Sequence, residues 1–482
     1  MGSLREEEAA AMDRKQVYAE KLNRYVTAMR NEKPDRVPIR PFAAEFTAKY
    51  AGFNCQQVTH DFNNAFAATR KTALDFEWDA AVGNMVYVWT GLTQAIGLRY
   101  YGIPGVDVDP NTGFQYLEPP ENQAFMRDDE YDALIDDPVA FLYNVWLPRV
   151  SRDVVPIGQP STYRNNLSFV KGGMAMLNYF MAFGTQGQLF RDEVGCVGAI
   201  SGIFKAPFDI IADKLRGYIG LMTDIVTQPD KVLAACVALM PHLLTVALSG
   251  ADPEKYVPIG FWMHRGCVPF ISHQHFETMY WATLKPIIQE IWSQGHQVLF
   301  YAEGNWTAHL EAFCELPERS IVFHCDQTDI QAARKILGDR FCISGGIPNY
   351  LLAYGTPQEV SDYTKKVIDT LGPDGGYILD ASAIIQNDAK VENVRAMTDT
   401  GREYGVYGGK PSTVPPVPPG KDSQPQQFVQ YHPHKKPGVC IPWAEKRKEI
   451  PVIKGDEQLV ARVWEENEAL AYTYIWHCLL SF

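Results

Sequence analysis

Two stretches decide the fold: Gln297-Val298-Leu299-Phe300-Tyr301-Ala302-Glu303-Gly304-Asn305 and Ser320-Ile321-Val322-Phe323-His324-Cys325-Asp326-Gln327-Thr328-Asp329. Each is an apolar run of the length of a buried strand, and each ends abruptly in ionisable residues. In a parallel α/β barrel, catalytic side chains lie at the carboxyl ends of the strands. We therefore expect Glu303 and Asp326 at the edge of an active site.

Strand and helix patterns alternate through the C-terminal half of the chain, which predicts a parallel sheet of βα units. The expected strands are 256–263, 297–303, 320–325, 341–345 and 377–381. The expected helices are 273–294, 307–314, 329–337, one beginning near 357, and 391–403. With further strands expected at 37–42 and 78–88, the total approaches the eight units of a TIM-type (β/α)8 barrel. An open doubly wound sheet is the alternative, although no dinucleotide-type glycine fingerprint follows a strand.

The other segments divide the chain into parts. Residues 1–36 predict an N-terminal helical segment and 37–407 the barrel, with a helical pair at 207–250. A large insertion at about 100–205 is rich in turn formers, glycine and aromatic residues, and we expect it to lie over the barrel mouth and shape the substrate pocket. Residues 408–482 predict a proline-rich linker and a C-terminal helical extension, ending in a helix at about 456–480. That helix is expected to pack on the barrel or on a second subunit through an apolar face of Leu459, Val463, Trp464, Leu470 and Tyr474.

Composition excludes several functional classes. The net charge of -13 argues against nucleic acid, which requires a basic footprint, and against an anionic membrane surface. The N-terminus has no apolar signal region, and no uninterrupted apolar run approaches the ~20 residues that span a bilayer. Nine scattered cysteines without a CxxC pair favour a reducing cytosol. We expect a soluble cytoplasmic enzyme acting on a small molecule, with a homodimer as an open alternative.

Ionisable residues gather at the predicted strand ends, where packing alone does not explain them because an unpaired buried charge costs several kcal/mol, roughly. Two structural alternatives remain open: Asp326 or Asp329 caps the following helix, and Glu303 forms an ion pair with Arg265. The catalytic candidates are Glu303, Tyr301, Asp326 and Arg265. The substrate-binding candidates are Arg40, Gln327 and Asp380.

A metal site is a further hypothesis for this edge. His264, Glu303 and Asp326, with Asp380, form a nitrogen and oxygen ligand set that zinc accepts. Cys267 and Cys325 lie near enough in sequence to add a thiolate. No signature spacing such as HExxH is present, since ligands from different strands carry none. The pair His432 and His434 lies in the tail and is expected to be a solvated turn.

Several pieces occur in a characteristic order: Lys33-Pro34-Asp35-Arg36-Val37-Pro38, Phe300-Tyr301-Ala302-Glu303-Gly304-Asn305, Leu337-Gly338-Asp339-Arg340 with Ile343-Ser344-Gly345-Gly346-Ile347-Pro348, Gly355-Thr356-Pro357-Gln358-Glu359-Val360, and Gly375-Gly376-Tyr377-Ile378-Leu379. Across residues 30–407 this ordered set resembles the uroporphyrinogen decarboxylase superfamily. The resemblance implies a TIM-type barrel. It also implies one of two chemistries, which are porphyrinogen decarboxylation without a cofactor, and zinc-dependent methyl transfer to or from a corrinoid.

The chain departs from both chemistries of that superfamily. True decarboxylases have an arginine-rich motif where this chain offers Arg40 alone, and their key aspartate falls near Val86. The zinc methyltransferases have His-x-Cys where this chain has Tyr301-Ala302-Glu303, and their further cysteine falls near Ala383. A harder site, built from Glu303 with His264 or Asp326, is expected to replace the missing thiolates.

These departures favour a methyltransferase that removes a methyl group from a small oxygen-linked donor and passes it to a corrinoid (cobalamin) on a partner protein. A metal, or a protonated Glu303 or Tyr301, would stabilise the departing oxygen. One alternative is a metal-independent decarboxylase or lyase, in which Arg40 or Arg265 grips a carboxylate and Asp326 protonates carbon. Another is a non-catalytic barrel that binds a corrinoid or another small ligand.

Overall fold

The computed structural model describes residues 2–82, 90–424 and 436–480. Its centre is a six-stranded parallel sheet in the order β10-β9-β8-β7-β6-β5. The strands are β5 (Ile203–Phe204), β6 (Ile259–Met263), β7 (Val298–Ala302), β8 (Ile321–Cys325), β9 (Cys342–Gly345) and β10 (Tyr377–Ile378). Every residue of β6 to β9 is buried, as their apolar runs predict. The predicted α/β class with a parallel sheet is confirmed.

Strand register brings the polar strand ends together. Met263 pairs with Ala302, and Ala302 pairs with Cys325, so β6, β7 and β8 end level with one another. The next residue on each strand is therefore His264, Glu303 or Asp326. Because parallel strands in register end at one edge of a sheet, these three residues lie along a single edge.

Further segments continue the hydrogen bonding beyond the β10 edge of the sheet. The N–H of Arg40 donates to the Leu379 carbonyl at 3.0 Å, next to β10, and the N–H of Asp79 donates to the Ile39 carbonyl at 2.9 Å. Strand β1 (Ala80–Ala81) then pairs in parallel with β4 (Val197–Gly198), which precedes β5. The rest of the strand expected at 78–88, and Val86 within it, lies outside the described residues.

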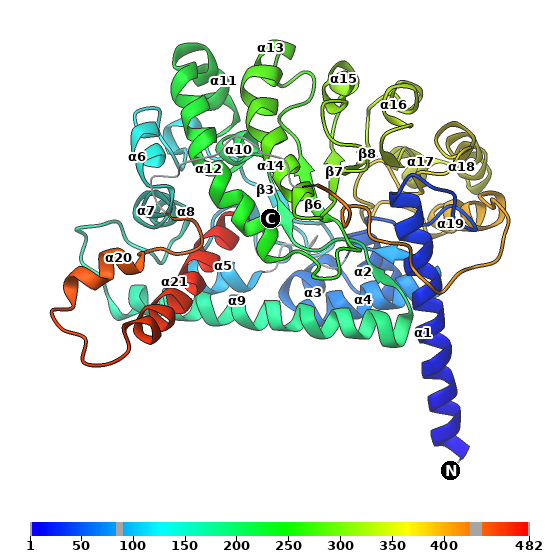
Figure 1. The fold of residues 1–482 in the computed structure, drawn as a ribbon, viewed down its shortest axis with the longest axis horizontal. Coiled ribbons are helices and arrows are strands. Elements are labelled where there is room, and N and C mark those ends of the chain that lie inside the picture. Colours follow the sequence, from blue (N-terminus) through cyan, green and yellow to red (C-terminus); the bar gives the residue numbers. More distant parts are fainter. Residues whose placement is uncertain (1, 83–89, 425–435, 481–482) are drawn as a thin grey trace.

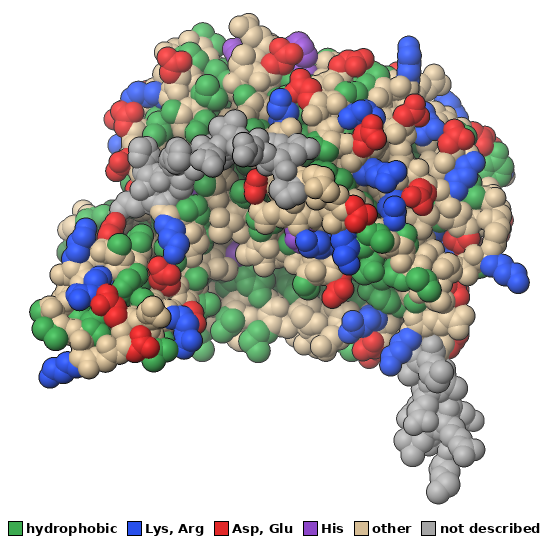
Figure 2. Space-filling model, in the orientation of Figure 1, with side chains coloured by type: hydrophobic (Ala, Val, Ile, Leu, Met, Phe, Trp, Pro, Cys, Tyr) green, Lys and Arg blue, Asp and Glu red, His purple; other side chains and the backbone are tan. Residues whose placement is uncertain are grey.

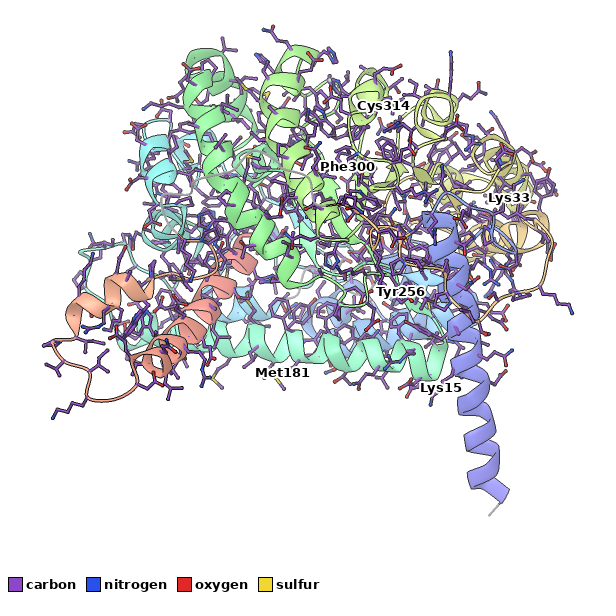
Figure 3. All side chains as sticks on the ribbon, in the orientation of Figure 1. Lys15, Lys33, Met181, Tyr256, Phe300 and Cys314 are labelled. Carbon is purple, nitrogen blue, oxygen red and sulfur yellow. The ribbon has the colours of Figure 1, made fainter. Side chains whose placement is uncertain are left out.

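Helices cover the sheet on its outer side (Figure 1). Those that follow the strands of the C-terminal half are α13 (His273–His275), α14 (Ala282–Ser293), α15 (Leu310–Phe313), α16 (Ile330–Leu337), α17 (Asn349–Tyr354), α18 (Pro357–Leu371) and α19 (Val391–Tyr404). The capping box predicted at the start of α18 is present, with Thr356 and Glu359 bonding each other's backbone N–H. Phe300 lies among these elements in the core, whereas Lys33 and Cys314 lie nearer the periphery (Figure 3).

The N-terminal half supplies the other helices. They are α1 (Gly2–Met29), α2 (Glu45–Ala51), α3 (Cys55–His60), α4 (Phe62–Asp75), α5 (Thr90–Ile96), α6 (Tyr131–Asp136), α7 (Pro138–Phe141), α8 (Leu147–Val150), α10 (Pro207–Ile210), α11 (Tyr218–Thr227) and α12 (Pro229–Ser249). By length and composition α12 could cross a membrane, with mean hydropathy 2.0, but 56% of that window is buried in the protein. It packs against α6 and α14, as a core helix does.

The insertion holds a long helix that the sequence did not predict. Helix α9 (Tyr163–Leu189) has 27 residues and runs along the lower edge of the molecule (Figure 1). An exposed apolar row lies on its outer face and includes Met181, which points away from the body in Figure 3. We name this row the α9 seam; it comprises Tyr163, Leu167, Val170, Met174, Leu177 and Met181, each at least 46% exposed. Before α9, a short antiparallel pair, β2 (Tyr101–Gly102) with β3 (Gln115–Tyr116), lies near the site.

The C-terminal extension forms α20 (Trp443–Lys446) and α21 (Glu457–Leu480). In the apolar face predicted for α21, Leu459, Val463 and Leu470 are more than half exposed, so they do not pack on the barrel, and packing on a second subunit stays a prediction. Burial is instead concentrated in the last turns, where the Trp476 ring stacks on His242 of α12 with centroids 5.2 Å apart. His432 and His434 lie outside the described residues. Acidic and basic side chains are intermixed over the visible face (Figure 2).

Candidate active site

A cavity of about 490 Å³ opens at the carboxyl edge of the sheet, and we name it the strand-end cavity. This volume is in the range of small-molecule sites, roughly 300–1,000 Å³. Its charged or titratable lining residues are Lys205, Asp213, Lys214, His264, Arg265, Glu303 and Asp326. Its aromatic lining residues are Phe42, Tyr101, Phe114, Tyr116, Trp262 and Phe270. The expectation that aromatic residues of the insertion shape the pocket is confirmed by Tyr101, Phe114 and Tyr116.

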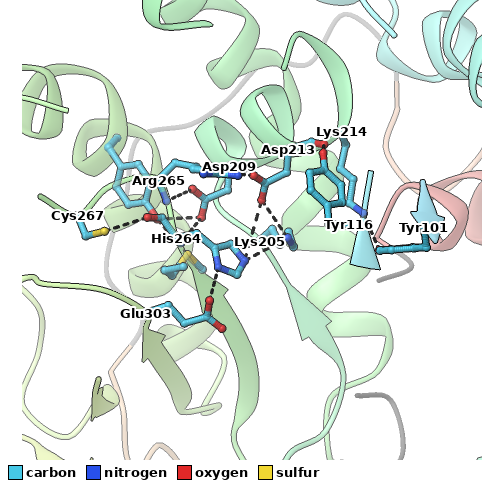
Figure 4. A network of polar contacts seen from close by, with 12 residues as sticks. Tyr101, Tyr116, Lys205, Asp209, Asp213, Lys214, His264, Arg265, Cys267 and Glu303 are labelled. Carbon is cyan, nitrogen blue, oxygen red and sulfur yellow. Dashed lines mark hydrogen bonds and ion pairs between the residues drawn. The ribbon is translucent and has the colours of Figure 1, made fainter. Parts of the chain in front are cut away.

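His264 is held between an acid and a lysine (Figure 4). Its Nδ1 lies 2.7 Å from Glu303 Oε2, and its Nε2 lies 3.2 Å from the Lys205 amine. Since the amine can only donate, Nε2 accepts in this arrangement and Nδ1–H donates to Glu303. Burial opposes a charged imidazole, but the Glu303 carboxylate outweighs burial and raises the pKa of His264. The pair can therefore hold a proton beside the cavity.

Glu303 is ionised in this pair. Burial acts to raise its pKa, but the neighbouring His264 outweighs that effect and the pKa is lowered. This lowered pKa disfavours a protonated Glu303 that donates to a departing oxygen. The predicted ion pair of Glu303 with Arg265 is wrong, because Glu303 pairs with His264 while Arg265 Nε donates to Asp213 Oδ1 at 2.7 Å.

Asp213 gathers the cations of the cavity. It lies on the π-helical turn η5 (Ile211–Leu215), and its carboxylate contacts Lys205 at 3.1 Å and Arg265 at 2.7 Å. Burial alone would raise the pKa of Asp213, but Lys205, His264 and Arg265 together lower it. The carboxylate stays charged, and it orients the lysine that faces His264.

Asp209 fixes the backbone of the loop that follows β6. It is fully buried and accepts hydrogen bonds from the backbone N–H of Arg265 at 2.9 Å and of His264 at 3.3 Å. The Tyr280 hydroxyl donates to the same carboxyl at 3.0 Å. A buried acceptor bonded to consecutive N–H groups sets the backbone direction, and with it the position of the His264 ring.

Lys214 is a second lysine at the cavity, from the insertion side. It is 3% exposed, and its amine donates to the Tyr101 hydroxyl at 3.2 Å and lies 4.3 Å from the centre of the Tyr100 ring. Burial, reinforced by the positive charge of Lys205, lowers the pKa of Lys214 well below its usual value. The Tyr116 hydroxyl donates to the Asp213 carbonyl, so that the insertion is tied to the turn bearing both residues.

Asp326 supplies a carboxyl group of a different kind. Burial raises its pKa to about 6, although the N–H of Gly304 donates to it at 2.8 Å and opposes the shift. The capping alternative is correct for Asp329, whose side chain accepts from two N–H groups at the start of α16, and not for Asp326. Asp326 therefore lines the cavity as an acid that can exchange a proton near neutral pH.

Three predicted residues lie away from the cavity. Arg40, Tyr301 and Asp380 are fully buried, and they are not among the described residues that line it. Arg40 contacts Asp380 at 3.2 Å, and the Tyr301 ring stacks on the His324 ring, 3.9 Å between centroids. Tyr301 packs at 5.1 Å against Phe42, a ring that does line the cavity. Arg40, Tyr301 and Asp380, with His324, therefore form a buried cluster behind the cavity-lining ring of Phe42.

Gln327 and the cysteines also differ from expectation. Gln327 is exposed and is not among the described cavity-lining residues; its N–H donates to the Gly304 carbonyl at 3.1 Å. Burial raises the pKa of Cys267 to about 11 and that of Cys325 further, so neither is a thiolate at neutral pH. In the described part of the chain, no three His, Cys, Asp or Glu side chains are arranged to hold a metal ion. The residues present do not fit zinc, and we derive no step through a metal.

Sequence reasoning missed the other half of the site. Lys205, Asp209, Asp213 and Lys214 come from a region assigned to the insertion and to a helical pair. One signal could have revealed Lys205: Ile203-Phe204-Lys205 is an apolar strand ending in an ionisable residue, the same pattern that identified Glu303. Asp209 and Asp213 are four residues apart near a helix start, which by itself indicates no site.

Comparisons with known proteins find one family model and one similar fold. The model of the uroporphyrinogen decarboxylase (URO-D) family matches residues 184–404. Among solved structures, the chain is similar to a methyltransferase from Methanosarcina mazei, with 14% identity and a TM-score of 0.53, over 80% of this chain and 98% of that one. At this identity the likeness concerns the fold alone. No curated protein sequence matches. The matched residues include His264, Glu303 and Asp326 at the strand ends, and the match and the fold similarity are both consistent with a divergent protein of the uroporphyrinogen decarboxylase-like type.

Proposed function

We propose that this protein is a methyltransferase that takes a methyl group from a small oxygen-linked donor and passes it to a corrinoid on a partner protein. One observation carries the proposal: His264 is held between Glu303 and Lys205 at the wall of a small-molecule cavity. A departing oxygen needs a proton, and this arrangement stores one. The match to the uroporphyrinogen decarboxylase family model and the fold similarity to the M. mazei methyltransferase support methyl transfer as the reaction class.

The reaction breaks the bond between the methyl carbon and the donor oxygen. The methyl carbon goes to the nucleophilic acceptor, and the electron pair stays on the oxygen. In the imidazolium form of His264, Nε2 carries a proton and no longer accepts the hydrogen bond from Lys205. That Nε2 proton is given to the departing oxygen, so an alcohol or phenol leaves. Glu303 stabilises the imidazolium before transfer, and Lys205 adds positive charge beside the developing oxyanion. Asp213 keeps Lys205 in place.

The acceptor must reach the methyl group from outside the enclosed part of the site. The strand-end cavity is about 490 Å³ and is already walled by aromatic rings from the insertion. It fits a small donor, so we infer that the corrinoid stays on its own protein. We also infer that the strand segments close into a (β/α)8 barrel, supported by the hydrogen bonds that join 37–43 to β10 on one side and to residue 79 on the other.

Methyl transfer is tested with isotopically labelled donors and a free corrinoid. The purified protein is mixed with ¹³C-methyl-labelled methoxybenzene or methanol and with chemically reduced cobalamin, and methylcobalamin is followed by absorbance and by NMR. We expect transfer by the wild-type protein and a loss of about 10²–10⁴-fold in Glu303→Gln, the range for removing an acid–base device. Asp362→Asn, an exposed change on α18, is the matched control. An unchanged rate in Glu303→Gln contradicts the mechanism.

A decarboxylase is the second candidate, and two observations favour it. Lys205 and Arg265 offer two cationic side chains for a substrate carboxylate. Asp326, with a pKa raised to about 6 by burial, can deliver a proton to the carbon that keeps the electron pair when carbon dioxide leaves. Release of carbon dioxide from small carboxylic acids, lost in Asp326→Asn, would favour this candidate over methyl transfer.

A further inference from the structure

A second cavity, of about 600 Å³, lies against α9, and we name it the α9 cavity. Aromatic and aliphatic side chains form much of its wall, among them Met176, Tyr179, Phe180, Phe183 and Phe190. None of its described lining residues is an acid, a lysine or an arginine. His477 belongs to the wall, and burial lowers its pKa to about 4, so it is neutral near pH 7.

The two cavities adjoin. Tyr101 and Ile203 line both of them, so the two cavities meet at these two side chains. On the side of the strand-end cavity, the Tyr101 hydroxyl accepts a hydrogen bond from Lys214. Ile203 lies on β5, two residues before Lys205, which contacts His264. The junction between the two cavities therefore lies beside the proposed reaction centre.

The chemistry of the two walls differs sharply. Seven acidic, basic or histidine side chains line the strand-end cavity, whereas the described wall of the α9 cavity offers neutral groups and apolar surface. A charged ligand in the α9 cavity would lose its hydration without gaining an ionic partner from the described wall. An uncharged hydrocarbon or aryl group loses nothing by leaving water and is favoured there.

We propose that the α9 cavity holds the uncharged apolar group of the substrate, while the oxygen-linked methyl group of the same molecule lies in the strand-end cavity. The inference rests on the proposed function, and it narrows the donor to methyl ethers whose oxygen bears an aryl group extended by a hydrocarbon substituent. Tyr101 and Ile203 position that molecule between a neutral chamber and a charged one. Methanol, which has no such group, is then a poor donor.

Two glycines allow the α9 cavity to be filled without displacing the wall. Gly187 on α9 and Gly198 on β4 both line it, and a Cβ built on either meets no atom within 4 Å. Gly187→Leu adds volume and also raises helix propensity, so the fold is expected to persist. Gly184→Leu is the matched control, since Gly184 is also open to a Cβ and lies on the same helix but not among the described lining residues.

Binding of two probes tests the assignment by calorimetry, with the acceptor left out so that neither probe reacts. Methoxybenzene and 4-propylmethoxybenzene differ by three carbons, and each buried methylene contributes about fourfold in Kd. We expect the wild-type protein and Gly184→Leu to bind the propyl compound at least about tenfold more tightly. Gly187→Leu and Gly198→Val should lose that preference and keep their affinity for methoxybenzene.

Each other result has a definite meaning. Equal affinity for the two probes in the wild-type protein, an undiminished propyl preference in both filled variants, or no binding of either probe overturns the assignment of the α9 cavity. If the propyl preference is present and disappears on filling, but no methyl group is transferred, the cavity assignment stands and the proposed reaction fails.

Discussion

Replacing Glu303 by Gln isolates the charge that acts on His264. Gln keeps an oxygen acceptor for Nδ1–H at the 2.7 Å contact and removes only the negative charge. A hydrogen bond to a charged group contributes about 1.5–3 kcal/mol, and one pKa unit corresponds to about 1.4 kcal/mol. We therefore expect the pKa of His264 to fall by about one to two units. Burial and Lys205, which both oppose a charged imidazole, are then no longer outweighed.

The pKa is measured by NMR on protein labelled with ¹³C at histidine, titrated between about pH 5 and 9, the range in which histidine changes charge. His264→Asn identifies the resonance. Asp326→Asn is the control, because that change removes a nearby carboxyl that makes no hydrogen bond to His264 in the described structure. A His264 pKa that is the same in wild type and Glu303→Gln would refute the account of the pair, and with it the proton store on which the mechanism depends.

Three further changes test the scaffold. Asp209→Ala leaves two backbone N–H groups and the Tyr280 hydroxyl without their buried acceptor. We expect the free energy of unfolding, measured by urea titration, to fall by about 2–4 kcal/mol. A loss no larger than that of Asp209→Asn would contradict the anchoring role. Thr356→Ala removes the N-cap of α18 and should cost about 1 kcal/mol in the same titration, while Thr356→Ser should be nearly neutral. Apolar residues of the α9 seam recur at intervals of three and four, as in a coiled coil, so we expect two copies of the chain to pair there. In sedimentation, Leu177→Glu should yield monomers, whereas the control Asn178→Glu should not. A monomeric wild-type protein would rule out the pairing.

Local pattern was enough to place most elements of the C-terminal half. The strands at 298–302 and 321–325 were predicted because a short apolar run that stops at ionisable residues is typical of a buried strand reaching a polar edge of its sheet. Helix α9 was missed because it has apolar side chains in two directions. Met176 and Phe183 face the α9 cavity, while Leu177 and Met181 lie in the exposed seam. The helix therefore lacks the pattern typical of a surface helix, in which one face is apolar and the opposite face is polar.

The sequence by itself determined that His264, Glu303 and Asp326 end neighbouring strands, and strand register then made them neighbours in space. Only the tertiary structure decided which polar residues share a cavity. It placed Arg40, Tyr301 and Asp380 beneath the aromatic rings, and it brought Lys205 and Asp213 to His264. The physical reason is that the periodicity of apolar residues shows only which side of a segment is buried. The partner of a buried charge is chosen instead by register and by the packing of segments distant in sequence, which periodicity does not contain.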